Sequence, residues 1–165
     1  MKPILEDELM TTKQEKISIM KELISFVESL KLLDELTWLT PLQEGKWSTC
    51  EIIGHIALWD RFFYEGAVLR IAQHESLTLK KVDFEQFNRE ASEYSKTVSK
   101  DKLLELTVQN RAAIIAALQR IPEEEYKIEH GSGKLSVDSY IEDFEHHDRH
   151  HMNQIKRFLE EHSLS

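Results

Sequence analysis

The chain has 165 residues, of which 31% are charged, and its formal net charge is -9 when the histidines are neutral. This length is typical of one domain with a single core, so we expect residues 1–165 to form one folded unit. The negative charge disfavours nucleic acid or anionic lipid as a partner, and the longest purely apolar run, Ala112–Leu118, is far shorter than the ~20 residues of a membrane-spanning helix.

The start of the chain and its cysteine content indicate a cytoplasmic protein. Acidic residues follow Met1 within a few positions, before an apolar signal-peptide core could form, so export by that route is not expected. The single cysteine, Cys50, excludes an internal disulfide framework and suits a reducing compartment. Cys50 falls in a predicted first helical turn, where the helix dipole can lower a thiol pKa. Because the sequence suggests no partner for it, we interpret Cys50 as structural.

The first long helix is predicted to begin at Thr12. Thr12 and Glu15 have the spacing of a capping box, in which each side chain bonds the other residue's backbone N–H. An apolar helical face follows and fades near Leu33–Leu36. The segment Thr40–Gly45 then has the composition of a connecting loop.

The second long helix is predicted to begin at Ser48, which has Glu51 three residues later. Its inward stripe has helical spacing and comprises Ile52, His55, Trp59, Phe62, Gly66 and Leu69. Gly54 lies beside this stripe, although glycine costs about 1 kcal/mol relative to alanine in a helix interior. This cost indicates that a neighbouring backbone or a ligand comes close to Gly54.

A long crossover is predicted between the second and third helices, and residues 83–98 within it contain a shorter helical piece. The third long helix, predicted for residues 100–121, ends before Pro122. Arg111 interrupts its apolar side. We interpret Arg111 either as a rim residue that extends its charge to solvent or as a clamp for a substrate.

The fourth long helix is predicted to begin at Ser136, with Asp138 in its first turn. Residues 123–135 before it form a polar connection, in which Tyr126–Ile128 could be extended. Four long amphipathic helices, one lengthy crossover and no convincing strand pattern predict an all-α fold, a four-helix bundle.

The fourth helix contains four histidines within six positions, His146, His147, His150 and His151. Residues four apart lie one turn above each other, about 6 Å along the axis, so two pairs could each bind one ion. His147 and His151 share an apolar face with Phe144 and Ile155, whereas His146 and His150 fall on the neighbouring polar face. The spacing therefore predicts that His147 and His151 point inward.

A metal site is predicted where this pair meets the second helix. Bundles build metal sites from inward side chains on facing helices, so His55 can join His147 and His151 as a third nitrogen ligand. Imidazoles suit Zn, Ni, Fe or Cu, and three protein ligands leave a coordination position open. That position should favour an anion such as hydroxide, carboxylate or thiolate, because three neutral ligands leave the charge of the ion uncancelled.

Other interpretations of these residues remain open. A single histidine on an apolar stripe, such as His55, is more often a hydrogen-bonded core residue than a ligand, and a histidine-rich segment can simply be a surface. A zinc-protease site is disfavoured, because Asp148 stands where that motif requires glutamate after its first histidine. Four carboxylates could orient the imidazoles or be solvated charges, namely Glu51, Asp60, Asp143 and Asp148.

Three blocks of the sequence resemble the DinB/YfiT-like superfamily. They are Pro41 to Ile56, which includes Gly45-Lys-Trp-Ser48 and Gly54-His55, the crossover segment Asp83-Phe-Glu-Gln-Phe-Asn88, and His147-Asp-Arg-His-His151-Met-Asn-Gln-Ile155. The blocks occur in the same order as in the family, and the resemblance spans nearly the whole chain.

The resemblance implies an up-down-down-up four-helix bundle with three metal-binding histidines, which match His55, His147 and His151. The family's metal is commonly zinc or nickel. Some relatives are S-transferases or isomerases that use bacillithiol or mycothiol, and others are described as metal-dependent hydrolases. The family also implies a small-molecule substrate and a homodimer.

Together, the residues and the resemblance predict a metal-dependent enzyme, either a thiol-dependent S-transferase or a hydrolase. The alternative is a metal-binding or stress-response module without turnover. A structural metal site is normally closed by four protein ligands, so a fourth ligand would favour this alternative.

Overall fold

The computed structural model describes residues 2–163 of the chain, with side chains described for residues 13–162. Its helices are α1 (Lys2–Ser29), α2 (Glu35–Leu39), α3 (Thr49–Phe63), α4 (Leu69–Ala72), α5 (Phe84–Ser95), α6 (Lys100–Arg120) and α7 (Val137–Ser163). A π-helical segment, Tyr64–Val68, joins α3 to α4. Over the described range the only β pairing is two isolated bridges, Pro41 with Ser48 and His130 with Leu135.

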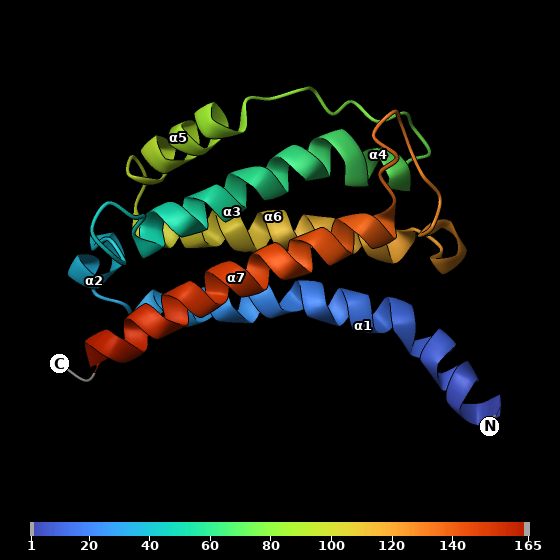
Figure 1. Cartoon of the computed structure of the whole chain (residues 1–165), viewed down its shortest axis with the longest axis horizontal. Helices are drawn as coiled ribbons and strands as arrows, with labels where there is room; N and C mark the ends of the chain where they lie inside the picture. Colours follow the sequence, from blue (N-terminus) through green and yellow to red (C-terminus); the bar gives the residue numbers. More distant parts are fainter. Residues whose placement is uncertain (1, 164–165) are drawn as a thin grey trace.

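Helices α1, α3, α6 and α7 form a four-helix bundle (Figure 1). Helices α1 and α7 run in one direction and α3 and α6 in the other, which is the expected up-down-down-up order. Helix α6 packs against α1 and α3, and α7 packs against the same two helices. The crossover between α3 and α6 carries α5, which packs on the outside of α3. The prediction of an all-α bundle with a long crossover is confirmed.

Of the predicted starts of the long helices, those at Ser48 and Ser136 have the expected side-chain cap, and the one at Thr12 is wrong. The backbone N–H of Glu51 donates to Ser48 Oγ (3.2 Å) and that of Ser139 donates to Ser136 Oγ (3.0 Å), as predicted. The predicted start at Thr12 is wrong, because α1 already begins at Lys2. A capping-box spacing alone does not start a helix, and the one proline upstream, Pro3, falls in the first turn, where proline is tolerated.

Two connections differ from the prediction. Helix α2 forms in the segment where the apolar helical pattern of the sequence ends. The Asp34 side chain caps this helix by accepting from the Thr37 N–H at 2.7 Å. The expected extended piece at Tyr126–Ile128 is instead a turn that follows a 3₁₀ segment, Glu123–Glu125. Tyr126 is buried, and its hydroxyl donates to the Leu118 carbonyl at 2.8 Å, which holds the turn against the end of α6.

The apolar core consists of two clusters separated by a polar layer. One cluster contains Met20, Ile114 and Ile141, and the other contains Leu23 and Leu104 with their neighbours. Between them along each helix lie the buried polar residues of the layer, Asp60 on α3, Arg111 on α6 and Asp148 on α7.

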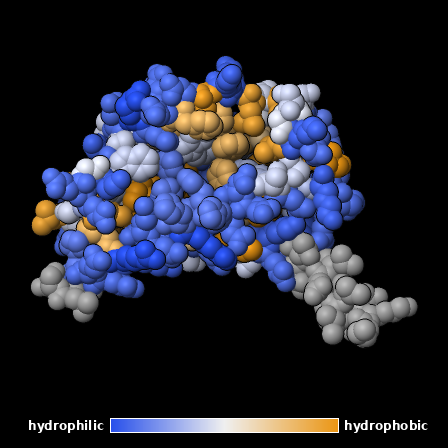
Figure 2. Space-filling view, viewed as in Figure 1, coloured by the Kyte–Doolittle hydropathy of each residue, from blue (hydrophilic) through white to orange (hydrophobic). Residues whose placement is uncertain are grey.

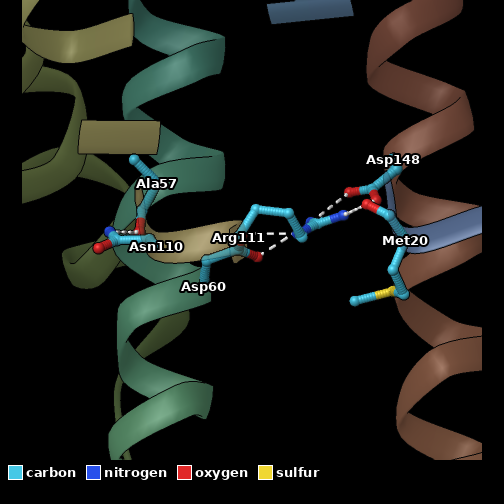
Figure 3. Close-up of polar contacts among 6 residues, drawn as sticks. All are labelled: Met20, Ala57, Asp60, Asn110, Arg111 and Asp148. Atoms are coloured by element: carbon cyan, nitrogen blue, oxygen red, sulfur yellow. Dashed lines mark hydrogen bonds and ion pairs between the residues drawn. The ribbon is translucent and has the colours of Figure 1, made fainter. Parts of the chain in front are cut away.

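Arg111 is the centre of this layer (Figure 3). Its guanidinium donates to both carboxylate oxygens of Asp60 (2.9 and 3.1 Å), to both of Asp148 (2.7 and 3.2 Å) and to the Met20 carbonyl of α1 (3.1 Å). The Arg111 side chain has no exposed surface. Both predicted roles for Arg111 are therefore wrong: it is neither a rim residue nor a substrate clamp, but links four helices from inside.

No helix among the described residues is both long enough and apolar enough to cross a membrane. The outer face is mostly hydrophilic, and apolar side chains gather along α3 between the crossover and α7 (Figure 2). Aromatic side chains link α3 to the crossover and to α7, since the ring centroids of Trp59 and Phe87 lie 3.9 Å apart and those of Phe63 and Phe144 lie 5.1 Å apart.

Candidate metal centre

Three imidazoles from α3 and α7 meet in the interior groove between these helices. His55 Nε2 lies 3.0 Å from His147 Nε2, and His151 Nε2 lies 3.2 Å from His147 Nε2. The three candidate ligand atoms all lie within 4.8 Å of one another. Two ligands of a tetrahedral zinc ion are separated by about 3.3 Å, given Zn–N bonds of about 2.0–2.1 Å. The spacing of the imidazoles is therefore close to the spacing that one ion requires.

Helical phase separates the four histidines of α7 as predicted. His151 is buried and His147 is half-buried, whereas His146 and His150 are exposed. The inward pair is one turn apart on the face that meets α3, where His55 is 5% exposed. The three predicted ligands are thus brought together, and the two outward histidines are not part of the group.

Gly54 allows the crossover helix to approach His55. A Cβ atom at Gly54 would lie 2.5 Å from Ser95 Cβ and 3.3 Å from the Ala91 carbonyl oxygen of α5. The prediction that a backbone comes close to Gly54 is confirmed, and the neighbour is α5. This approach places Asn88 of α5 beside the imidazole of His55.

Asn88 fixes the tautomer of His55. Trp59 Nε1–H, which can only donate, donates to Asn88 Oδ1 at 2.8 Å, so the amide oxygen must face α3. His55 Nδ1 lies 3.0 Å from the same oxygen and therefore carries the proton that it donates. The lone pair of His55 is consequently on Nε2, which points at the other two histidines.

A second amide holds His151 in the same way. Gln154 Oε1 lies one turn along α7 and accepts from His151 Nδ1–H at 2.9 Å. This bond leaves the lone pair of His151 on Nε2. Histidines that bind metals usually donate their other ring N–H to such an acceptor, which orients the ring.

Burial keeps the three imidazoles neutral. Desolvation, with smaller effects of the neighbouring imidazoles, lowers the pKa of His55 to about 3 and that of His151 to about 4. Desolvation also lowers the pKa of His147, although the adjacent Asp148 carboxylate acts in the opposite direction. All three rings are thus in the form that binds a metal at neutral pH.

The three imidazoles cannot satisfy one another by hydrogen bonds, but together they can bind a cation. The Nε2 atoms of His55 and His151 are both acceptors, and His147 Nε2 has at most one proton to share between them. At least one of the two short N···N contacts then has no proton between its nitrogens, so that two electron-rich atoms repel each other. A positive ion between the three nitrogens removes this repulsion, so the donor set is that of a metal site.

The predicted carboxylates have other roles. Asp60 and Asp148 bind Arg111, Glu51 caps α3 and accepts from Ser92 Oγ, and Asp143 is exposed. The residues that orient the imidazoles, Asn88 and Gln154, were not predicted. Both residues lie in blocks that carry the family resemblance, Asn88 in Asp83–Asn88 and Gln154 in His147–Ile155, but the sequence gives neither of them a role at the site.

Cys50 is not a ligand. Its thiol is buried and donates to the Ser95 carbonyl at 3.3 Å, and burial raises its pKa. The structural interpretation of Cys50 therefore agrees with its surroundings, and the helix dipole does not activate the thiol.

A cleft of about 740 Å³ borders the group at His151. His151 and Gln154 line it on the α7 side, and Trp47 lines it on the side of α3. The Trp47 ring lies 5.0 Å from the ring of His55, so the cleft reaches both helices that supply the imidazoles. Of the three clustered histidines, His151 is the one that lines this cleft.

Comparisons with known proteins identify the family and agree with the fold. A family model described as "DinB superfamily" matches residues 22–155, which include all three histidines. YfiT from Bacillus subtilis, described as "a probable metal-dependent hydrolase with an unusual four-helix bundle topology", superposes with a TM-score of 0.74 over 92% of this chain and 87% of that chain, at 18% sequence identity. At this identity the likeness shows a shared fold. No curated protein matches the sequence significantly.

Proposed function

The chain belongs to the DinB superfamily, and on this basis we propose that it is a metal-dependent enzyme whose divalent ion is held by His55, His147 and His151. The observation that carries the proposal is the convergence of three neutral imidazoles, each of which offers one ring nitrogen within 4.8 Å of the other two. The amide partners of His55 and His151 support it, because they direct the lone pairs of both rings to one point.

Zinc or nickel suits this site best. Imidazole nitrogen is a common ligand for both ions, whereas magnesium and calcium prefer cages of oxygen atoms. The carboxylates nearest to the site, Asp60 and Asp148, are engaged by Arg111 and do not provide such a cage.

The site favours chemistry over a purely structural role. Among the described residues, the group that can hold an ion has three members, whereas a structural zinc site normally has four protein ligands. A bound ion would supply Lewis acidity, which makes a thiol or a water molecule a better nucleophile at neutral pH. The cleft beside His151 gives a small-molecule substrate access to that position.

Two reaction classes fit this arrangement, transfer to or from a low-molecular-weight thiol and hydrolysis. In both, the protein would hold the imidazoles in a fixed tautomer through Asn88 and Gln154 and shield one side of the site with Trp47. The description of YfiT as a probable hydrolase supports the second class. A metal-binding module without turnover remains the competing function.

A crystal structure with anomalous scattering data at the zinc and nickel edges tests the proposal. We expect one ion bound to His55, His147 and His151, with solvent or a small molecule completing its coordination. A fourth protein side chain on the ion would support the module without turnover instead, and an ion bound to the exposed His146 and His150 would contradict the assignment.

A further inference from the structure

The cleft beside the three histidines has an unusual charge for this protein. The chain carries a formal charge of -9, but two cationic side chains line the cleft, Lys46 from the loop before α3 and Arg157 on α7. One carboxylate, that of Glu161, lines it as well. The local balance of fixed charge is therefore positive, next to a site that would itself hold a cation.

Both cations are free to bind a ligand. Within the part of the chain that the structure describes, neither Lys46 nor Arg157 forms an ion pair, whereas Arg111, Arg149 and Arg70 do. Lys156, the neighbour of Arg157, points elsewhere, with its Nζ 5.6 Å from the Phe26 ring centroid. Lys46 and Arg157 thus line the cleft without an ion-pair partner among the described residues, and one carboxylate, that of Glu161, lines the cleft with them.

The rest of the cleft suits a short polar molecule. Its lining includes apolar side chains, Leu42, Ile52 and Phe158, and the amides of Gln43 and Asn153. The apolar residues can contact a carbon chain, and the amides can bond to polar groups along it. His151, a member of the imidazole group, and Trp47, whose ring centroid lies 5.0 Å from that of His55, also line the cleft.

We propose that this cleft binds the anionic end of the substrate through Lys46 and Arg157, while the reacting end lies at the three histidines. The proposal rests on the proposed metal-dependent function and names its substrate class: a small molecule with a carboxylate or a similar anion that is separated from its reacting atom by several bonds. A guanidinium is well suited to this role, because it binds a carboxylate through two parallel N–H donors.

The distance between the bound anion and the metal site follows from the geometry of α7. His151 and Arg157 are six residues apart, which corresponds to a rise of about 9 Å along the helix. Arg157 and His151 both line the cleft. The bound anion therefore lies away from the metal site and does not compete for it.

Thiol binding to the cobalt-loaded protein tests the proposal. Mercaptohexanoate and mercaptohexanol differ only in their terminal group, and coordination of either thiolate to cobalt gives a charge-transfer band that reports binding without turnover. We expect the wild-type protein to bind mercaptohexanoate more tightly than mercaptohexanol. The variants Arg157→Gln and Lys46→Gln should each reduce this preference about two- to fivefold, and the double variant about tenfold, with mercaptohexanol affinity unchanged.

A matched control separates the cleft from overall charge. Arg120→Gln removes an exposed arginine at the end of α6, which does not line the cleft, and should leave the preference as in the wild type. Circular dichroism and cobalt stoichiometry show whether each variant is folded and loaded. Increasing salt should weaken the preference of the wild type more than that of the double variant.

The outcomes are distinguishable. If cobalt binds but the two thiols bind equally well to the wild type, or if the double variant keeps the full preference, the anion site is refuted while the metal site stands. If the folded wild type retains no cobalt, the proposed function fails and the anion site fails with it.

Discussion

The protonation of His55 is set by side chains on two different helices. Trp59 on α3 and Asn88 on α5 form a chain of hydrogen bonds in which the indole N–H fixes the amide and the amide oxygen fixes the imidazole. Because the indole can only donate, the direction of the whole chain is determined. His55 therefore presents Nε2 to the site before any ion arrives.

Removal of the Asn88 amide should weaken metal binding. Asn88→Ala leaves His55 Nδ1 without its acceptor, and we expect about a 10- to 100-fold loss of zinc affinity, the range found for partners that orient metal-binding histidines. Asn88→Asp keeps an oxygen acceptor and should retain most of the affinity. Competition titration with a chelator measures both, and equal affinities of the alanine variant and the wild type would refute this role for Asn88.

Acid should destabilise the metal-free protein through the same histidines. The pKa is about 3 for His55 and about 4 for His151 in the folded protein, against about 6.5 in the unfolded chain. Between these values the unfolded chain binds protons that the folded chain does not, so the free energy of unfolding rises with pH in this window and falls as the solution is acidified from about pH 6.5.

The variant His55→Gln isolates the contribution of one ring. The unfolding free energy of both proteins is measured by denaturant titration without metal between pH 4.5 and 7. We expect the slope of this free energy against pH to be smaller in the variant than in the wild type, by on the order of 1 kcal/mol per pH unit. Parallel curves for the variant and the wild type would show that His55 is as easily protonated in the folded protein as in the unfolded chain.

The clustering of the three histidines could be predicted from sequence, but their hydrogen-bond partners could not. His147 and His151 share the apolar face of one helix with Phe144, and this period determines which way they point. Asn88 lies on another helix, 33 residues from His55. An amide that bonds across two helices has no fixed spacing in the sequence, so only packing reveals it.

At the scale of elements, the crossover is part of the site and not merely a connection. Helix α5 packs on α3 at Gly54, where a side chain would meet Ser95 and the Ala91 carbonyl. The absence of a Cβ atom there sets the distance between α3 and α5, and with it the distance between His55 and Asn88. The crossover thus orients a metal-site residue that belongs to the bundle.

Gly54→Ala should therefore disturb both stability and the site. The new Cβ would lie 2.5 Å from Ser95 Cβ, so α5 must move, and we expect a loss of about 1–3 kcal/mol in unfolding free energy despite the better helix propensity of alanine. Zinc affinity should fall as well, since Asn88 moves with α5.

Gly133→Ala serves as the control for this change, because a Cβ at Gly133 meets no atom within 4 Å. Its unfolding free energy should stay within about 0.5 kcal/mol of the wild type. Full stability and full zinc affinity of Gly54→Ala would show that α5 adjusts freely and does not position Asn88.

Long elements were more predictable than short ones. Helices α3, α6 and α7 have a sustained apolar period and a cap, such as Ser48 or Ser136, and both signals agree. Helix α2 has five residues, too few for a period, and depends on the Asp34 cap. Tyr126–Ile128 has apolar residues at a β-like spacing, but burial of the Tyr126 ring beneath α6 determines its conformation.

Across the whole molecule, a buried charge layer holds the bundle together at the level of the site. Arg111 binds Asp60 on α3, Asp148 on α7 and the Met20 carbonyl on α1. Although burial alone would lower the Arg111 pKa, the two carboxylates raise it above its usual value, so the guanidinium remains charged. Asp148 is adjacent to His147 in α7, and the layer thereby fixes the helix that carries two of the three imidazoles.

Arg111→Met should be strongly destabilising, because it leaves two buried carboxylates without their partner. We expect a loss of about 3–5 kcal/mol in the free energy of unfolding, measured by denaturant titration. Arg149→Met removes the exposed pair with Glu145 and should cost less than about 1 kcal/mol. Similar losses for the two variants would contradict the central role of the layer.

The metal content of protein purified without a histidine tag tests the three-histidine site most directly. We expect one divalent ion per chain in the wild type, none in His147→Ala, and one in His146→Ala, which removes a histidine of the same helix that is exposed and outside the group. Circular dichroism should show equal helicity in all three. An unchanged ion content in folded His147→Ala, or loss of the ion in His146→Ala, would contradict the account.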